Sequence, residues 1–145
     1  PIGRGELLRE GNDLTIVALG TATLPAIRAA EILAADGIDT EVINARFVKP
    51  LDAAMILGSV RKTGLLVTVE EAALAGGFGS AVLEELAAAD LRIPVDRLGL
   101  ADHFFDHASQ SALRREAGID AESIAHRAAA LLRRHRFVAT PAPAH

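Results

Sequence analysis

Short runs of β-branched and other apolar residues alternate along this chain with longer runs rich in alanine and leucine. The short runs have the length and composition of buried strands, and the longer runs place apolar residues at helical spacing. Strands that alternate with helices form βαβ units, in which helices cover both faces of a mainly parallel sheet. The alternation therefore predicts an α/β fold.

Turn and capping residues divide the pattern into five strands and five helices. Gly11–Asp13 separates the first two strands, so we expect a hairpin that makes the first strand antiparallel. Thr23 is expected to cap the first helix and Gly37 to end it, and Asp52 is expected to cap the second. The expected strands cover residues 4–10, 14–19, 40–44, 65–69 and 95–98. The expected helices cover about residues 24–36, 53–61, 80–89, 110–117 and 121–134.

The composition excludes several classes of protein and site. The 145 residues are 50% hydrophobic and 23% charged, which is typical of one globular domain. The absence of cysteine excludes disulfides, zinc fingers, iron–sulfur clusters and thiol nucleophiles. A net charge of −4 and the lack of tryptophan and tyrosine argue against a nucleic-acid partner.

No membrane partner is expected either, and the chain divides into a domain and a tail. The longest stretch without a charge, residues 72–83, is too short to span a bilayer, and no secretory signal opens the chain. We expect residues 1–138 to form the folded domain. The Ala/Pro-rich residues 139–145 are expected to be a disordered tail.

The most unusual segment follows the strand expected at residues 65–69. Glu70 and Glu71 end this strand, and a glycine-rich turn, Gly76–Ser80, opens the next helix. Ligands and partners collect at the carboxyl ends of strands in open α/β sheets, and a helix N-terminus attracts anions. The spacing matches neither dinucleotide nor Walker fingerprints. Two interpretations of the glycines remain open. They form a docking or anion-contact element, or they simply allow a tight loop and close packing of the helix.

The two glutamates are not expected to act as an acid/base pair. Adjacent residues of an extended strand point to opposite sides of the sheet. We expect one of Glu70 and Glu71 to be solvated and the other to cap the following loop or helix.

The remaining polar residues form no complete catalytic set. Asp102-His103 and Asp106-His107 could be oriented bases or metal ligands, or they could be polar residues of a loop. None of the serines lies in a G-x-S-x-G elbow, which argues against a hydrolase triad. Arg46 follows a strand end and could bind a carboxylate or phosphate, or form a surface or interdomain ion pair.

Five segments together resemble one family in order and spacing. Because of these segments, the chain resembles the C-terminal domain of the 1-deoxy-D-xylulose-5-phosphate synthases, which are thiamine-diphosphate enzymes of the transketolase group. The resemblance covers about residues 1–133. The segments are RGELLREGND (residues 4–13), NARFVKPLD (44–52), LVTVEE (66–71), AGGFGSAVLE (75–84) and RLGLADHFFDHAS (97–109).

This resemblance implies a fold and the activity of a longer parent enzyme. The fold is a three-layer αβα domain with a five-stranded mixed sheet whose first strand is antiparallel. The parent transferase condenses pyruvate with glyceraldehyde 3-phosphate, giving 1-deoxy-xylulose 5-phosphate and CO₂ for isoprenoid and thiamine biosynthesis. Thiamine diphosphate and Mg²⁺ bind in two upstream domains. No catalytic, cofactor-binding or metal-binding role therefore passes to a residue of this chain.

The resemblance also implies a docking role in a cytoplasmic homodimer, with the chain's own upstream domains and a second subunit as partners. Three departures from the family pattern, at Ala72, Ala101 and Ala108, lie in the loops that would make such contacts. The alternatives are a free-standing subunit of a 2-oxo-acid dehydrogenase E1-like complex and a small-anion-binding module. The candidate contact residues are Arg46, Glu70, Glu71, Gly76, Gly77, Gly79, Ser80, Asp102 and His107.

Overall fold

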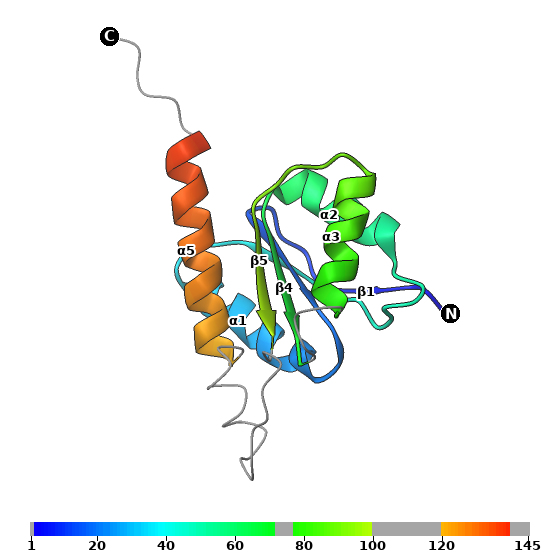
Figure 1. The fold of residues 1–145 in the computed structure, drawn as a ribbon. Helices are drawn as coiled ribbons and strands as arrows, with labels where there is room; N and C mark the ends of the chain where they lie inside the picture. Colours follow the sequence, from blue (N-terminus) through cyan, green and yellow to red (C-terminus); the bar gives the residue numbers. More distant parts are fainter. Residues whose placement is uncertain (1, 72–76, 100–119, 140–145) are drawn as a thin grey trace.

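A computed structural model describes residues 2–71, 77–99 and 120–139 as an α/β fold with one mixed sheet (Figure 1). The strands are β1 (Glu6–Arg9), β2 (Leu14–Ala18), β3 (Thr40–Asn44), β4 (Leu66–Glu70) and β5 (Val95–Gly99). The helices are the short 3₁₀ helix η1 (Gly20–Ala22), α1 (Thr23–Ala35), α2 (Ala53–Thr63), α3 (Phe78–Ala88) and α5 (Ala121–Ala139). The five-stranded mixed sheet and its antiparallel first strand are confirmed.

The sheet has the strand order β1-β3-β2-β4-β5, and the predicted hairpin between the first two strands is wrong. β1 is antiparallel to β3, which lies between β1 and β2, and all other pairs are parallel. The turn at Gly11–Asp13 is attached to the start of β3, because the N–H of Asp13 donates to the carbonyl of Asp39 at 2.8 Å. The chain therefore crosses the start of β3 before it enters β2.

The crossing depends on the glycine at position 11. A Cβ atom there would lie 2.3 Å from the carbonyl carbon of Thr40 and 2.5 Å from the backbone nitrogen of Glu41. No side chain fits between two backbones at that distance. Gly11 therefore allows the connection between β1 and β2 to pass over β3.

Helices cover both faces of the sheet, which confirms the three-layer prediction (Figure 1). Leu14 and Ile16 of β2 pack with α1 and α5 on one face. Val17 packs with α2 and α3 on the other face, as the alternation of side chains along a strand requires. All five residues of β2 and of β4 are buried, which is expected for central strands that are covered on both sides.

The helix ends show which local signals were predictive. The Asp52 side chain accepts a hydrogen bond from the Met55 N–H at 3.2 Å, which confirms it as the cap of α2. Gly37 ends α1 with a φ of 78°, as predicted. Thr23 is wrong as a cap, because η1 begins the helical path earlier and Ala22 takes the N-cap position of α1.

Two helices differ in length from the prediction, and one cannot be compared. α3 begins at Phe78, two residues before the expected start, and α5 continues to Ala139 rather than ending near residue 134. The helix expected at about residues 110–117 lies outside the described residues. Within the described part of the chain, no helix has both the length and the apolar character needed to cross a membrane.

Candidate functional site

The carboxyl ends of β2, β3, β4 and β5 lie together at one edge of the sheet, which we call the carboxyl edge. The described residues that directly follow β2, β3 and β4, and those that precede the antiparallel β1, lie at this edge. In an α/β sheet this is where a site is expected. Six of the candidate residues are both described and located here: Arg46, Glu70, Glu71, Gly77, Gly79 and Ser80.

Glu70 is the buried cap of α3. Its side chain is 1% exposed, and its two carboxylate oxygens accept hydrogen bonds from the N–H groups of Phe78 at 2.6 Å and Gly79 at 2.9 Å. These are N–H groups of the first turn of α3, which the helix itself leaves unsatisfied. The negative charge also lies at the positive end of the helix dipole. The capping role predicted for one of the two glutamates is therefore confirmed for Glu70.

Gly79 allows α3 to begin this close to the sheet. A Cβ atom on Gly79 would lie 2.8 Å from Nε of Arg97 and 3.1 Å from Oγ1 of Thr68. The Arg97 side chain comes from β5 and donates a hydrogen bond to Oγ of Ser80 at 2.8 Å. The close-packing role of the glycine-rich turn is thus visible at Gly79, and Ser80 joins α3 to β5.

Glu71 joins two loops of the carboxyl edge. Oγ1 of Thr21, in η1, donates a hydrogen bond to Oε2 of Glu71 at 2.5 Å. Because Glu70 contacts α3 and Glu71 contacts η1, the two glutamates point to opposite faces of the sheet, as predicted. Thr21 was not predicted as part of the site, because its contact depends on the adjacency of β2 and β4, and no local sequence signal reports that adjacency.

Arg46 lies after β3 in a backbone conformation that is uncommon for a residue with a side chain. Its φ is 63°, and its backbone N–H donates to Oδ1 of Asn44 at 3.1 Å. Its guanidinium carbon lies 5.4 Å from the centre of the Phe47 ring, within the range of a cation–π interaction. The side chain is exposed at the carboxyl edge.

The first described residues lie against the same edge. The Gly5 N–H donates to Oδ2 of Asp52 at 2.8 Å, so Asp52 binds the entering chain as well as capping α2. A Cβ atom on Gly3 would lie 2.8 Å from Cγ of Pro50, which shows how closely the two segments pack. Three candidate residues, Gly76, Asp102 and His107, lie outside the described residues, as do the departures at Ala72, Ala101 and Ala108.

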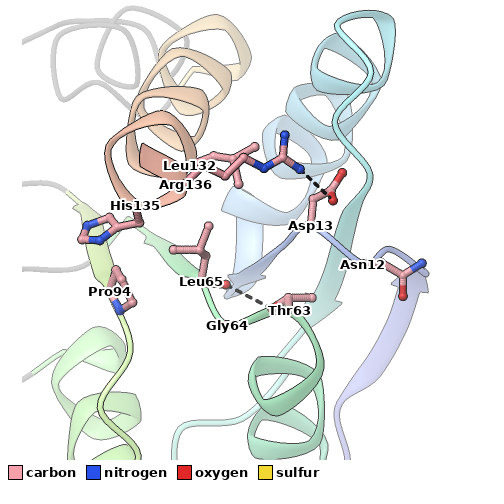
Figure 2. A pocket seen from close by; sticks show the side chains of 9 residues that line it. All are labelled: Asn12, Asp13, Thr63, Gly64, Leu65, Pro94, Leu132, His135 and Arg136. Atoms are coloured by element: carbon pink, nitrogen blue, oxygen red, sulfur yellow. Dashed lines mark hydrogen bonds and ion pairs between the residues drawn. The ribbon is translucent and has the colours of Figure 1, made fainter. Parts of the chain in front are cut away.

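A pocket of about 460 Å³ lies at the opposite, amino edge of the sheet (Figure 2). Leu65 and Leu132 give it apolar walls, and Arg136 of α5 forms an ion pair with Asp13 at 3.2 Å. No residue of this pocket was predicted as part of a site, because its lining comes from segments that are distant in the sequence. The remaining lining residues are Asn12, Thr63, Gly64, Pro94 and His135.

A buried carboxylate, Glu41, lies near this amino edge. It is 4% exposed and accepts hydrogen bonds from Nζ of Lys62 at 2.5 Å and from the Gly11 N–H at 3.2 Å. Burial opposes its ionisation, but hydrogen bonds from Lys62, Ser59 and Gly11 outweigh burial and hold the pKa of Glu41 below its usual value. The residues described by the structure include no cluster of three or more His, Asp or Glu suited to a metal ion.

Comparison with known proteins gives one consistent family. A sequence profile described as "Transketolase, C-terminal domain" matches residues 3–124. The chain is 69% identical over 142 residues to a 1-deoxy-D-xylulose-5-phosphate synthase of Thermomicrobium roseum, covering 98% of the chain and 23% of that protein. It is 52% identical over 145 residues to the 1-deoxy-D-xylulose-5-phosphate synthase 1 of Geobacter sulfurreducens, covering 99% of the chain and 22% of that protein. The chain thus spans less than a quarter of the length of these relatives.

Solved structures show the same fold. The chain superposes with a TM-score of 0.83 and 40% identity on a protein described as a split-gene transketolase in an inactive β4 tetramer, covering 90% of this chain and 42% of that one. It also superposes on a transketolase of Pichia stipitis with a TM-score of 0.61, covering 91% of this chain and 18% of that one. At 18% identity, the second likeness concerns the fold alone.

Proposed function

Because this chain belongs to the transketolase C-terminal domain family, we propose that it forms the C-terminal domain of a thiamine-diphosphate-dependent 1-deoxy-D-xylulose-5-phosphate synthase. The observation that carries the proposal is the 69% identity to such a synthase over nearly the whole chain. In this proposal the parent is a cytoplasmic transferase that joins pyruvate to glyceraldehyde 3-phosphate with release of CO₂. The chain supplies less than a quarter of that enzyme and holds none of its catalytic residues.

The role we propose for the chain is to dock against the upstream catalytic domains and to complete the homodimer. The carboxyl edge supports this role, since it gathers the exposed Arg46, the Glu71–Thr21 hydrogen bond and residues 77–80 of the glycine-rich turn. Gly5 is bound to the same edge through Asp52. A polypeptide that leads into Gly5 therefore meets the domain at the carboxyl edge and does not have to pass across the sheet to reach it.

The N-terminus of α3 does not fit the diphosphate group of the cofactor. An anion at a helix N-terminus binds the free N–H groups of the first turn. Here the carboxylate of Glu70 already accepts two of these hydrogen bonds, from Phe78 and Gly79, and it would repel a second anion. We infer that thiamine diphosphate and its Mg²⁺ bind in the upstream part of the parent.

The same contact disfavours the small-anion-binding module. The other alternative, a free-standing E1-like subunit, is not favoured because the relatives that cover the whole chain are described as 1-deoxy-D-xylulose-5-phosphate synthases. A titration with phosphate or diphosphate tests the anion module directly, because a ligand that binds only the folded chain raises its unfolding temperature. We expect no shift.

The proposed function is tested by exchanging domains in the Thermomicrobium roseum synthase. Its matching segment is replaced by this chain, which is 69% identical over 142 residues, to give a full-length chimera. We expect synthase activity with pyruvate and glyceraldehyde 3-phosphate within about threefold of the unmodified enzyme, a difference of less than about 1 kcal/mol in the activation barrier. Deletion of the segment is expected to abolish activity and the dimer.

A matched control replaces the same segment with the corresponding domain of the Pichia stipitis transketolase, which shares the fold at 18% identity. This control is expected to be inactive, because a common fold does not supply matching contact residues. A folded but inactive chimera with the present chain would contradict the proposal. A deletion variant that still dimerises and turns over normally would contradict the docking role.

A further inference from the structure

The backbone around Arg46 holds this residue in its left-handed conformation from both sides. The preceding Ala45 is 1% exposed, and its N–H donates to the carbonyl of Ala18 at 2.9 Å. The following Phe47 donates its N–H to the carbonyl of Ala45 at 2.7 Å. A non-glycine residue with a φ of 63° is strained, and such strain persists only where the surroundings impose it. Strained residues of this kind cluster at functional sites.

The guanidinium of Arg46 also has a contact within the chain. It lies over the Phe47 ring, which restricts a side chain that would otherwise move freely in water. No ion pair of the described residues involves it. A cation that is ordered in advance loses less conformational entropy on binding, so the contact it makes is stronger.

The surroundings of Arg46 favour a protein carboxylate over a small ligand. Arg46 is exposed, and it lines neither the pocket at Asp13 nor the one at Leu91, so among the described residues it is a surface cation rather than part of either cavity. Two more exposed cations, Arg4 and Lys49, lie on the segments that pack together at Gly3 and Pro50. An acidic protein surface complements this arrangement, and a guanidinium binds a carboxylate with two parallel hydrogen bonds.

We infer that Arg46 is the anchor of the docking surface, and that it forms an ion pair with a carboxylate on the upstream part of the parent synthase. This inference rests on the proposed function. It adds the chemistry of the partner surface, which is acidic, and it identifies the residue on which docking depends. It also gives a role to the strained backbone at Arg46, where the side chain is exposed.

The test uses the full-length chimera and measures trypsin cleavage after Arg4, which is exposed in the chain alone. Docking of the carboxyl edge is expected to protect this bond. Arg46→Ala is expected to speed cleavage by roughly 10- to 100-fold, which corresponds to the loss of one charged hydrogen-bonded contact. Added salt is expected to speed cleavage in the wild type but not in Arg46→Ala, because salt screens exposed ion pairs.

Arg46→Gly separates docking from folding. Glycine adopts a φ of 63° without strain, so this variant is expected to unfold at a temperature no lower than that of the wild type. Loss of protection in Arg46→Gly therefore cannot come from misfolding. Arg92→Ala, which removes an exposed arginine after α3, is the matched control and is expected to leave cleavage unchanged.

The outcomes distinguish the inference from the proposed function. If the wild-type chimera is cleaved after Arg4 as fast as the isolated chain, the edge is not covered and the docking role is wrong. If the wild-type chimera is protected and Arg46→Ala is protected equally, docking stands and the ion pair is wrong. Protection that is lost in both Arg46→Ala and Arg46→Gly, but kept in Arg92→Ala, supports the inference.

Discussion

At the scale of single residues, Glu70 shows how one buried charge can fix a turn. The carboxylate is shielded from water, and its stability depends on two backbone N–H groups and the dipole of α3. The neighbouring Glu71 accepts a hydrogen bond from Thr21 in a more exposed place. The two glutamates are adjacent in sequence, yet their contributions to stability should differ.

We expect Glu70→Gln to lower the free energy of unfolding by about 2–3 kcal/mol, because the amide loses the charge and turns one NH₂ group toward a backbone N–H. Glu71→Gln, the matched control, is expected to change it by less than about 1 kcal/mol, because Glu71 is only partly buried and a glutamine oxygen can still accept the hydrogen bond from Thr21. Urea denaturation of the two variants measures the difference. Equal effects would show that Glu70 is not the cap that orders the start of α3.

Glu41 makes the stability of the chain depend on pH. Its folded pKa lies below its unfolded value, so its contribution is present above the unfolded pKa and is lost as the pH falls through the folded pKa. We expect Glu41→Gln to cost on the order of 1–2 kcal/mol near neutral pH, an amount limited by the exposure of Lys62. The difference between wild type and variant should shrink below about pH 4. Urea denaturation from about pH 3 to pH 7, in steps of about one unit, tests this; a difference that stays constant would contradict it.

At the scale of elements, local signals predicted the helix ends and failed for the strand order. Asp52 and Gly37 act within a few residues of themselves, so their roles can be predicted from the sequence. The position of β3 between β1 and β2 depends on a contact between Gly11 and Thr40, which are far apart in the chain. A turn signal reports that the chain bends, but it does not report which strand will be the neighbour.

The crossing of β3 gives a prediction with an internal control. We expect Gly11→Ala to lower the free energy of unfolding by about 3 kcal/mol, because its Cβ would lie 2.3 Å from a backbone carbon that cannot move aside. Gly58→Ala in α2 is expected to raise it by about 1 kcal/mol, because alanine favours a helix and nothing lies within 4 Å of its Cβ. Both variants are compared by urea denaturation. An unchanged free energy of unfolding in Gly11→Ala would mean that the backbones at Gly11 and Thr40 are not in contact.

At the scale of the whole molecule, the folded unit extends beyond the family match. The match ends at residue 124, but Ala128, Leu131 and Leu132 of α5 are buried in the core against α1. Arg127 also binds Asp96 of β5 with two hydrogen bonds, at 2.5 and 3.0 Å. The second half of α5 is therefore part of the domain rather than an appendage.

We expect a chain that ends at residue 124 to lose cooperative unfolding, because one face of the sheet would lose much of its cover. Leu131→Ala alone is expected to cost about 2–4 kcal/mol, since the side chain is 2% exposed. Arg133→Ala, on the exposed side of the same helix, is the control and should cost less than about 0.5 kcal/mol. Calorimetry of the three variants tests this, and a truncated chain that still unfolds in a single sharp transition would contradict it.

The candidate site could be predicted as a region but not as a set of contacts. Because sites form at the carboxyl ends of strands, the sequence alone is enough to place Glu70, Glu71 and Arg46 at one edge of the sheet. The contact between Thr21 and Glu71 could not be predicted, because it depends on strand order. The left-handed backbone of Arg46 could not be predicted either, since one of the two hydrogen bonds that flank it, from Ala45 to Ala18, depends on which strand lies beside β3.

The contact between Gly5 and Asp52 has a consequence for how strongly the carboxyl edge needs to bind. In the proposed parent, the upstream polypeptide is covalently attached beside Arg46, so docking is a unimolecular event. A short tether of this kind gives an effective concentration of about a millimolar or more. An interface too weak to join two separate proteins would then remain almost fully closed.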